Sequence, residues 1–255
     1  MIDTVKFREK GYLTGLEAFR PGERPHLLAV YRRLRALLPP GVPADRMDWW
    51  HARDRELWEI CRAPRILDWV EEILGPDFYI WGSQFFCKDP GDARTVPWHQ
   101  DAFYWPLSPP RSLTVWVAVS DVDEGNGAMQ VLPRTHREKL PHAATGREGD
   151  VLDSGIDPGA IDPSGAVSLV LEAGQASIHD DRIAHGSGPN RSGRPRLGLT
   201  IRFSAGEVRC DTSVWPFFKA FWCRGRDRWG HNPAGAPPTS NMSEFENVTP
   251  GTAER

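Results

Sequence analysis

Apolar residues recur with helical spacing up to about Gly75 and with strand spacing after it. In the segment 24–41 (RPHLLAVYRRLRALLPPG) they return every three or four residues, as on one face of an α-helix, and two prolines end the pattern. The segment 64–75 (PRILDWVEEILG) repeats this spacing. We therefore expect two amphipathic helices that pack through these positions: Leu27, Tyr31, Leu34 and Leu38 in the first, and Ile66, Leu67, Val70, Ile73 and Leu74 in the second.

Beyond Gly75, short segments rich in Val, Ile, Phe, Thr and Trp alternate with turns, which is typical of β-strands. The 24 Gly and 23 Pro of the chain suit a fold with many turns. Short strands with no helical pattern between most of them favour a mainly β fold, a double-sheet jelly roll or barrel, over a parallel βαβ sheet. The predicted strands are residues 77–88, 95–102, 111–121, 127–134, 166–173, 175–181, 183–188 and 196–205.

These patterns predict a single domain over residues 1–240. Residues 1–75 form a helical cover, residues 76–206 the jelly-roll core, and the aromatic-rich residues 207–240 a C-terminal cover. The polar residues 241–255 are expected to be a flexible tail. A Gly-, Asp- and His-rich insertion at about 135–163 is expected to be a functional lid or a disordered loop.

Composition excludes several functions. The net charge of −3 without a basic block argues against a nucleic-acid partner. No apolar run has the roughly 20 residues of a membrane span, and the N-terminus lacks a signal-peptide pattern. The cysteines form no CxxC pair, so neither a disulfide framework nor a zinc finger is supported: Cys61, Cys87, Cys210 and Cys223. We expect a cytoplasmic protein.

The segment TVPWHQDAFYW (95–105) holds the first candidate chemistry. His99 and Asp101 are two residues apart, so on a strand both side chains point to one face and can share a metal ion. Two imidazoles and one carboxylate are the ligand set of non-haem Fe(II) oxygenases. Because the pair alone is also common at solvated strand ends, it does not identify a metal site without further residues.

Those residues occur in IHDDRIAHGSGPNRSGRPR (178–196). His185 lies on a predicted strand, and Arg196 follows 11 residues later, where its guanidinium could pair with a dicarboxylate whose other end chelates the metal. His179 is the rival third ligand, although a strand-end or supporting role suits it better because only His185 has Arg196 at this distance.

With these motifs the sequence resembles the phytanoyl-CoA dioxygenase (PhyH) family of Fe(II)- and 2-oxoglutarate-dependent oxygenases. The resemblance runs from about Phe7 to Ser204 and rests on WHQDAFYWPL, TVWVAVSD with EGNGAMQVLPRTH, and HGSGPNRSGRPR, in the family's order. It implies a cupin-like double-stranded β-helix that uses Fe(II), 2-oxoglutarate and O2. It also implies His99, Asp101 and His185 as the iron ligands that carry catalysis, and Arg196 as the anchor of the distal 2-oxoglutarate carboxylate.

The same resemblance suggests further 2-oxoglutarate contacts at Gln84, Trp116 and Ser187, with Thr114 as another inward-pointing candidate. One departure is PRTH, where Arg134 replaces a glycine that is usual in the family, and this puts the conformation of that loop in doubt.

The implied activity is hydroxylation of a small molecule, with release of succinate and CO2, by a monomer or homodimer. Related halogenases replace the metal-binding carboxylate with a small residue, so Asp101 favours oxygenation. Desaturation, ring formation or carbon–heteroatom cleavage by the same kind of oxygenase remains an alternative, as does a non-catalytic jelly-roll binding module.

Aromatic side chains near the metal motif are candidates for substrate contact, although packing is the ordinary role of such residues. They are Phe86, Trp98, Tyr104, Trp105 and Trp215, with Tyr104 and Trp105 favoured. Lys88, Arg111 and Arg202 could instead receive a substrate acid, but solvated surface charge is the simpler interpretation of each.

Overall fold

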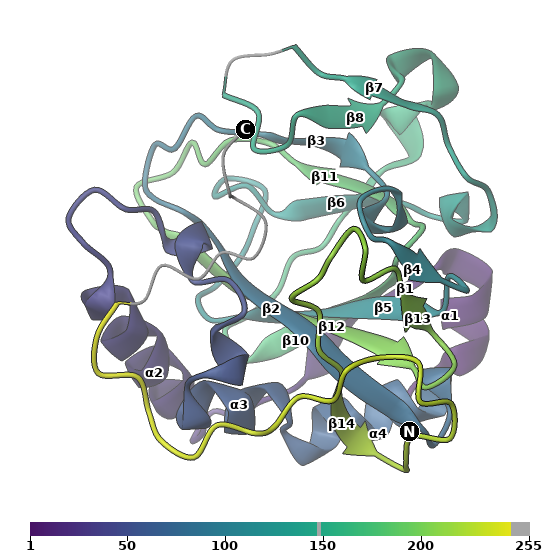
Figure 1. The fold of residues 1–255 in the computed structure, drawn as a ribbon. Coiled ribbons are helices and arrows are strands. Elements are labelled where there is room, and N and C mark those ends of the chain that lie inside the picture. The colour runs from purple at the N-terminus through teal and green to yellow at the C-terminus, as the bar shows by residue number, and fades with distance from the viewer. Residues whose placement is uncertain (147–148, 246–255) are drawn as a thin grey trace.

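Two antiparallel sheets form the centre of the protein (Figure 1). The computed structural model describes residues 1–146 and 149–245. One sheet has six strands in the order β1-β10-β5-β12-β2-β14, and the other has four in the order β3-β11-β6-β9. This is the arrangement that the jelly-roll prediction required. The strands of the first sheet are β1 (Tyr12–Glu17), β10 (Gln175–Asp180), β5 (Ser112–Ala118), β12 (Arg196–Ala205), β2 (Phe78–Lys88) and β14 (Phe221–Arg224). Those of the second are β3 (Val96–His99), β11 (Ala184–Ser187), β6 (Met129–Leu132) and β9 (Val167–Ser168).

Helices cover the outer face of the six-stranded sheet. The two predicted helices are present as α2 (Arg24–Leu37) and α4 (Pro64–Leu74), and α1 (Thr4–Lys10) and α3 (Arg55–Cys61) accompany them. Their apolar residues share one buried cluster with outward side chains of the sheet, including Val115, Leu199 and Ile201. Burial of this apolar surface is the main stabilising term of the fold.

Both edges of the six-stranded sheet come from segments that were expected to be covers. β1 lies within the N-terminal 75 residues and pairs with β10, and β14 lies in the aromatic-rich C-terminal segment and pairs with β2. Neither strand was predicted, because each is short and is stabilised by pairing with a strand far away in sequence. The predicted strand 166–173 is shorter than expected, since only β9 and a single bridge from Leu171 to Val122 are formed.

The insertion at 135–163 contains regular structure around a two-stranded ribbon. β7 (His142–Ala144) pairs with β8 (Ser154–Ile156), and β8 lies next to β3 (Figure 1). Residues 147–148 of this insertion lie outside the described residues. The remaining short elements are η1 (Ala44–Arg46), η2 (Trp50–Ala52), η3 (Asp101–Phe103), β4 (Leu107–Ser108), η4 (Thr135–Arg137), η5 (Pro158–Ala160), η6 (Pro163–Gly165) and β13 (Arg209–Cys210).

The PRTH turn takes the backbone conformation that a glycine would take. Arg134 has φ +75°, in the left-handed region, and its guanidinium donates to Glu9 Oε1 at 2.9 Å. The replacement of glycine by Arg134 therefore preserves the turn at the expense of some backbone strain.

Of the predicted flexible tail, residues 246–255 lie outside the described residues. Among the helices of the described chain, none is long and apolar enough to cross a membrane.

Candidate metal centre and its cavity

His99 and His185 face each other across two neighbouring strands of the four-stranded sheet. They are directly paired in the β3–β11 register, and their ring centroids are 4.1 Å apart. His99 Nδ1 lies 2.9 Å from Pro97 O, and His185 Nδ1 lies 3.0 Å from Ile183 O. A carbonyl only accepts, so each Nδ1 carries the proton and each Nε2 keeps a free lone pair.

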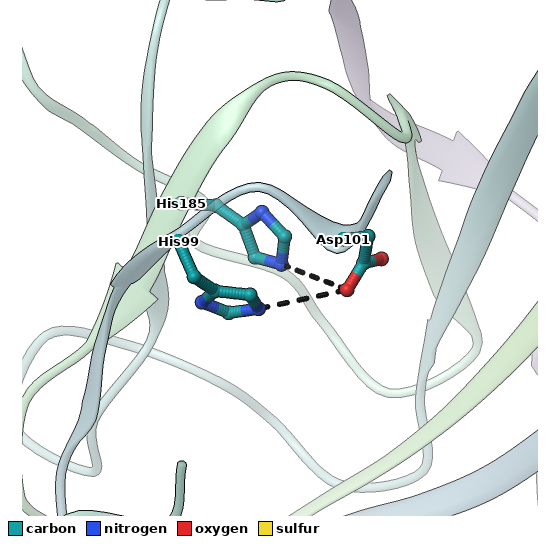
Figure 2. Close-up of side chains that lie close together, drawn as sticks. All are labelled: His99, Asp101 and His185. Carbon is teal, nitrogen blue, oxygen red and sulfur yellow. Dashed lines mark ion pairs between the residues drawn. The ribbon is translucent and has the colours of Figure 1, made fainter. Parts of the chain in front are cut away.

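Asp101 completes the group from a turn. The predicted strand 95–102 ends at His99, and Asp101 begins the 3-10 helix η3, but Gln100 keeps an extended backbone and so holds the two side chains on one side. Asp101 Oδ1 lies 3.5 Å from His99 Nε2 and 3.9 Å from His185 Nε2 (Figure 2). One ligand atom from each of the three residues falls within 4.8 Å of the others.

These three residues fit a divalent metal. Two imidazole nitrogens and one carboxylate oxygen converge, and the backbone bonds at both Nδ1 atoms leave the lone pairs of the Nε2 atoms available. Burial lowers the pKa of His185 well below its usual value, and the neighbouring His99 adds to this effect. A neutral imidazole is the form that binds a metal.

The Asp101 carboxylate accepts a hydrogen bond from one further side chain and lies close to another. Thr114 Oγ1 donates to Asp101 Oδ2 at 3.2 Å, and His179 Nε2 lies 3.7 Å from the same oxygen. Burial opposes ionisation of Asp101, but the neighbouring imidazoles of His179, His99 and His185 outweigh it and hold the pKa of the carboxyl well below its usual value. Asp101 is therefore available as an anionic ligand.

His179 lies beside the three converging residues and is not one of them. Its ring centroid is 4.7 Å from that of His185, and its side chain is buried. Neither of its ring nitrogens has a hydrogen-bond partner in the described part of the chain. The geometry thus favours His185 over His179 as the third ligand and gives His179 a position behind the Asp101 carboxylate.

Gln100 points away from the metal centre into the insertion. Its amide donates to Thr135 O at 3.4 Å, to Glu138 O at 2.8 Å and to Arg182 O, and its oxygen accepts from Leu140 N at 2.9 Å. Gln100 therefore connects the start of the insertion to the metal centre through hydrogen bonds.

A cavity of about 400 Å³ opens onto the metal centre, and Arg196 lies in its wall. Arg196 is 3% exposed; its Nη1 donates to Gly127 O at 2.7 Å, and its guanidinium lies 5.8 Å from the Trp116 ring centroid. Gly198 makes room for that ring, because a Cβ at this position would fall 1.9 Å from Trp116 Cζ2. Ser187 also lines the cavity, and its buried Oγ has no partner among the described residues.

Two of the residues expected to contact 2-oxoglutarate line the cavity but already have protein partners. Gln84 donates from Nε2 to Asp45 O at 3.0 Å and accepts from Arg202 Nη2 at 3.0 Å. Thr114 donates to Asp101, as described above. Both side chains therefore support neighbouring residues of the cavity wall.

The aromatic candidates divide into two groups. Phe86, Tyr104 and Trp105 line the cavity, and the Tyr104 hydroxyl donates to Ser154 O of β8 at 2.6 Å. Trp215 packs against Trp81 with ring centroids 5.7 Å apart, and it is not among the described residues that line the cavity. Trp98 packs in a separate apolar cluster with Leu132 and Ile156.

The three basic candidates also differ in position. Lys88 is buried and donates from Nζ to the carbonyl oxygens of Arg94, at 2.9 Å, and Gly188, and burial lowers its pKa to about 7. Arg111 pairs with Glu207 and donates to Leu74 O. Arg202 lines the cavity.

Several cavity residues were missed by the sequence analysis. Thr200 is one of them, and its alternation with Arg196 along one strand was an available signal. Three more lie on predicted strands: Val96, Met129 and Gly186. The rest come from η1 and from the connection between β7 and β8, whose approach to the cavity has no local sequence signature: Asp45, Arg46, Val151 and Leu152.

Comparison with known proteins agrees with this geometry. A model of the phytanoyl-CoA dioxygenase (PhyH) family matches residues 27–198. Phytanoyl-CoA dioxygenase, peroxisomal, of Mus musculus is 30% identical over 200 residues, which make up 73% of this chain and 58% of the mouse protein. A probable alpha-ketoglutarate-dependent hypophosphite dioxygenase of Stutzerimonas stutzeri is 30% identical over 160 residues, which are 62% of this chain and 54% of that protein. The chain thus spans about half the length of the curated relatives that it matches.

Among solved structures, the apo form of the non-heme monooxygenase ThoJ superposes with a TM-score of 0.77 at 30% identity, over 93% of this chain and 89% of that one. The family match extends over more than half of the sequence and includes all three converging residues and Arg196. The chain therefore belongs to the phytanoyl-CoA dioxygenase family of Fe(II)- and 2-oxoglutarate-dependent oxygenases.

Proposed function

We propose that this protein is a non-haem Fe(II)- and 2-oxoglutarate-dependent dioxygenase that hydroxylates a small molecule and releases succinate and CO2. One observation carries the proposal: His99, Asp101 and His185 converge on the same cavity that Arg196 lines. A buried cation at some distance from a metal centre is suited to a dicarboxylate that binds both.

In this mechanism the iron, with 2-oxoglutarate, supplies the oxidising chemistry of dioxygen, and the chain supplies position and shielding. His99, Asp101 and His185 would hold the metal, with Thr114 keeping the Asp101 carboxylate oriented. Arg196 would pair with the distal carboxylate of 2-oxoglutarate, and the free Ser187 hydroxyl is suited to donate to the same group. Trp116 forms the wall beside that guanidinium and excludes water from it.

Asp101 also bears on the type of oxidation. A carboxylate at this position occupies the ligand place that a halide would need, so the proposal is oxygenation and not halogenation. Phe86, Tyr104 and Trp105 are proposed to contact the substrate, because they line the cavity.

We further propose that residues 1–240 act as one domain in the cytoplasm, as a monomer or homodimer. The cavity of about 400 Å³ supports a small-molecule substrate, and the net charge of −3 argues against a nucleic-acid partner.

Anaerobic addition of Fe(II) and 2-oxoglutarate tests the proposal directly. Chelation of the iron by 2-oxoglutarate is expected to produce a weak visible metal-to-ligand charge-transfer band. His99→Ala should abolish the band, because it removes one of the three metal ligands. Arg196→Ala should raise the 2-oxoglutarate concentration needed for half the band by about 10-fold or more, since a charge-assisted hydrogen bond is lost.

His26→Ala is the matched control, because His26 is exposed on α2 and lies outside the cavity. A wild-type protein without the band, or a band that survives His99→Ala, would contradict the assignment. Succinate formation stimulated by a candidate substrate would then identify the molecule that is hydroxylated.

A further inference from the structure

A second arginine lies on the same face of β12 as Arg196. Side chains alternate along a strand, so Arg196 and Arg202, six residues apart, both point into the cavity, and both line it. At roughly 3.3 Å per residue, their backbones are about 20 Å apart. The proposed function uses only Arg196, so a cation at the other end of the cavity has no assigned ligand.

The surroundings of Arg202 resemble a prepared binding site. Its guanidinium lies 5.7 Å from the Trp81 ring centroid and 5.8 Å from that of Trp105, and its side chain is 12% exposed. Nη2 donates to Gln84 Oε1 at 3.0 Å, whereas the buried Nε has no hydrogen-bond partner within residues 1–146 and 149–245. A buried N–H without an acceptor is unfavourable, so a ligand oxygen would relieve this cost.

The nearest carboxylate does not fill that place. Asp48 Oδ1 lies 3.9 Å from Arg202 Nη1, which is beyond hydrogen-bond distance. Asp48 therefore balances part of the charge and leaves Nε free. Arg46, the last residue of η1, lines the same cavity and adds a further cation.

A glycine on the neighbouring strand gives Arg202 its position. Gly82 of β2 is paired with Arg202, and a Cβ at this position would lie 3.2 Å from Arg202 Cδ and 3.5 Å from Nη1. A side chain at position 82 would therefore require Arg202 Cδ to move by a few tenths of an ångström. The absence of a side chain at Gly82 of β2 thus leaves space for the Arg202 side chain of β12.

The register also relates Arg202 to the metal centre. Arg202 is paired with Thr114 of β5, and Thr114 is paired in turn with His179 of β10. Thr114 is the residue that donates to Asp101 Oδ2. Neighbouring strands are about 4.8 Å apart, so a molecule held at Arg202 would extend directly to the metal centre from the side of Asp101.

We propose that Arg202 binds an oxyanion of the prime substrate, a carboxylate or a phosphonate or phosphate group, at the end of the cavity opposite to Arg196. This inference rests on the proposed function and adds the class of substrate, an organic acid whose body contacts Phe86, Tyr104 and Trp105. Lys88 and Arg111 do not compete for this role, because their donors are engaged by backbone carbonyls or by Glu207.

Calorimetric titration of the anaerobic Fe(II) and 2-oxoglutarate complex tests the assignment. Saturating 2-oxoglutarate fills the Arg196 end, and the probes are phenylacetate, phenylphosphonate and the neutral phenylacetamide. The wild-type protein should bind at least one acid about 10-fold or more tightly than the amide, and Arg202→Gln should abolish this preference by weakening acid binding about 10- to 100-fold. The two acids distinguish a carboxylate substrate from a phosphorus oxyanion.

Two further variants guard against a folding defect in Arg202→Gln. Gly82→Ala keeps the guanidinium but displaces it, and it should weaken acid binding about 3- to 10-fold while amide binding is unchanged. Arg111→Gln is the matched arginine control, since Arg111 lies outside the cavity, and it should bind all three probes like the wild type.

Three results would overturn the anion site: no preference for either acid in the wild type, an undiminished preference in Arg202→Gln, or equal losses for acids and amide. In each case an intact charge-transfer band would leave the oxygenase proposal standing. A missing band together with an Arg202-dependent preference for acids, measured with the same additions, would overturn the oxygenase proposal and support the anion site.

Discussion

The two faces of β12 differ in nearly every chemical respect. The outward residues pack in the cluster beneath the helices and are buried and apolar: Leu197, Leu199, Ile201 and Phe203. The inward residues face the cavity or adjoin it and are polar or small: Arg196, Gly198, Thr200 and Arg202. The outward side chains of β12 thus stabilise the fold, and its inward side chains form part of the binding site. Because side chains alternate along a strand, one set can be substituted without changing the other.

The difference extends to unsatisfied polar atoms. Around the cavity, buried atoms without a partner in the described chain include both ring nitrogens of His179, Ser187 Oγ, and the Nε atoms of Arg196 and Arg202. The outward row contributes only apolar side chains. Buried polar atoms without partners lower the free energy of unfolding, and this is common in binding sites. A ligand that binds in the cavity should therefore stabilise the folded protein measurably.

The largest expected effect is a loss of Fe(II) affinity after substitution of a residue that faces the cavity. His185→Ala removes one of the three converging nitrogen and oxygen donors, and Fe(II) affinity should fall by more than the roughly 100-fold typical of losing a supporting residue. The free energy of unfolding of the metal-free protein should change little, because a buried imidazole is replaced by an apolar methyl group. Metal titration and urea unfolding measure the two quantities. A large loss of metal-free stability would show that the cavity lining also carries the fold.

The next effect belongs to the outer side. Leu199→Ala should lower the free energy of unfolding by about 3 kcal/mol, because a fully buried side chain is replaced by a cavity beneath the helices. Fe(II) affinity of the folded fraction should remain that of the wild type. If Leu199→Ala weakened Fe(II) binding 10-fold, the two faces of β12 would be coupled and the comparison would break down.

A smaller effect should come from the support of Asp101. Thr114→Val removes the hydroxyl that donates to Asp101 Oδ2 while keeping the shape of the side chain, and Fe(II) affinity should fall about 10-fold. Thr200→Val is the matched control, because the Thr200 hydroxyl donates to Gln84 O at 3.0 Å and contacts no candidate ligand. Equal Fe(II) affinities of the two variants would remove Thr114 from the support of the metal centre.

The smallest expected effect is on the free energy of unfolding and comes from a residue outside β12. Arg134→Gly should raise the free energy of unfolding by about 0.5 kcal/mol, since glycine adopts the left-handed backbone conformation without a steric penalty. Arg134→Ala keeps the Cβ and loses the ion pair with Glu9, so it separates the backbone contribution from the charge. A glycine variant less stable than the alanine variant would refute the strain argument, and neither change should affect Fe(II) binding.

Sequence reasoning succeeded where local periodicity or a dense motif carried the information. Alternation predicted β12, and the ordered motifs singled out His99, Asp101 and His185, whose side chains converge in the structure. It failed where a structure depends on contacts between segments that are far apart in the sequence. β1 and β14 exist because other strands pair with them, and Trp215 packs in an aromatic cluster and not in the cavity lining, which only the folded chain reveals.

The pattern of hydrogen bonds within the site was equally hidden. No local pattern showed that Thr114 would support Asp101, or that Gln84 would accept from Arg202. Each of these contacts joins residues on different strands or turns, and their partners depend on the register of the whole sheet.

The anchoring of the insertion by Gln100 has a consequence for engineering. The Gln100 side chain, between two proposed ligands, forms hydrogen bonds with the backbone of residues 135–140. The Tyr104 hydroxyl donates to the carbonyl oxygen of Ser154 in β8. Val151 and Leu152, between these fixed points, line the cavity from the connection that joins β7 to β8. Libraries of side chains at positions 151 and 152 can therefore alter substrate preference while the strands that bear the proposed ligands stay unchanged.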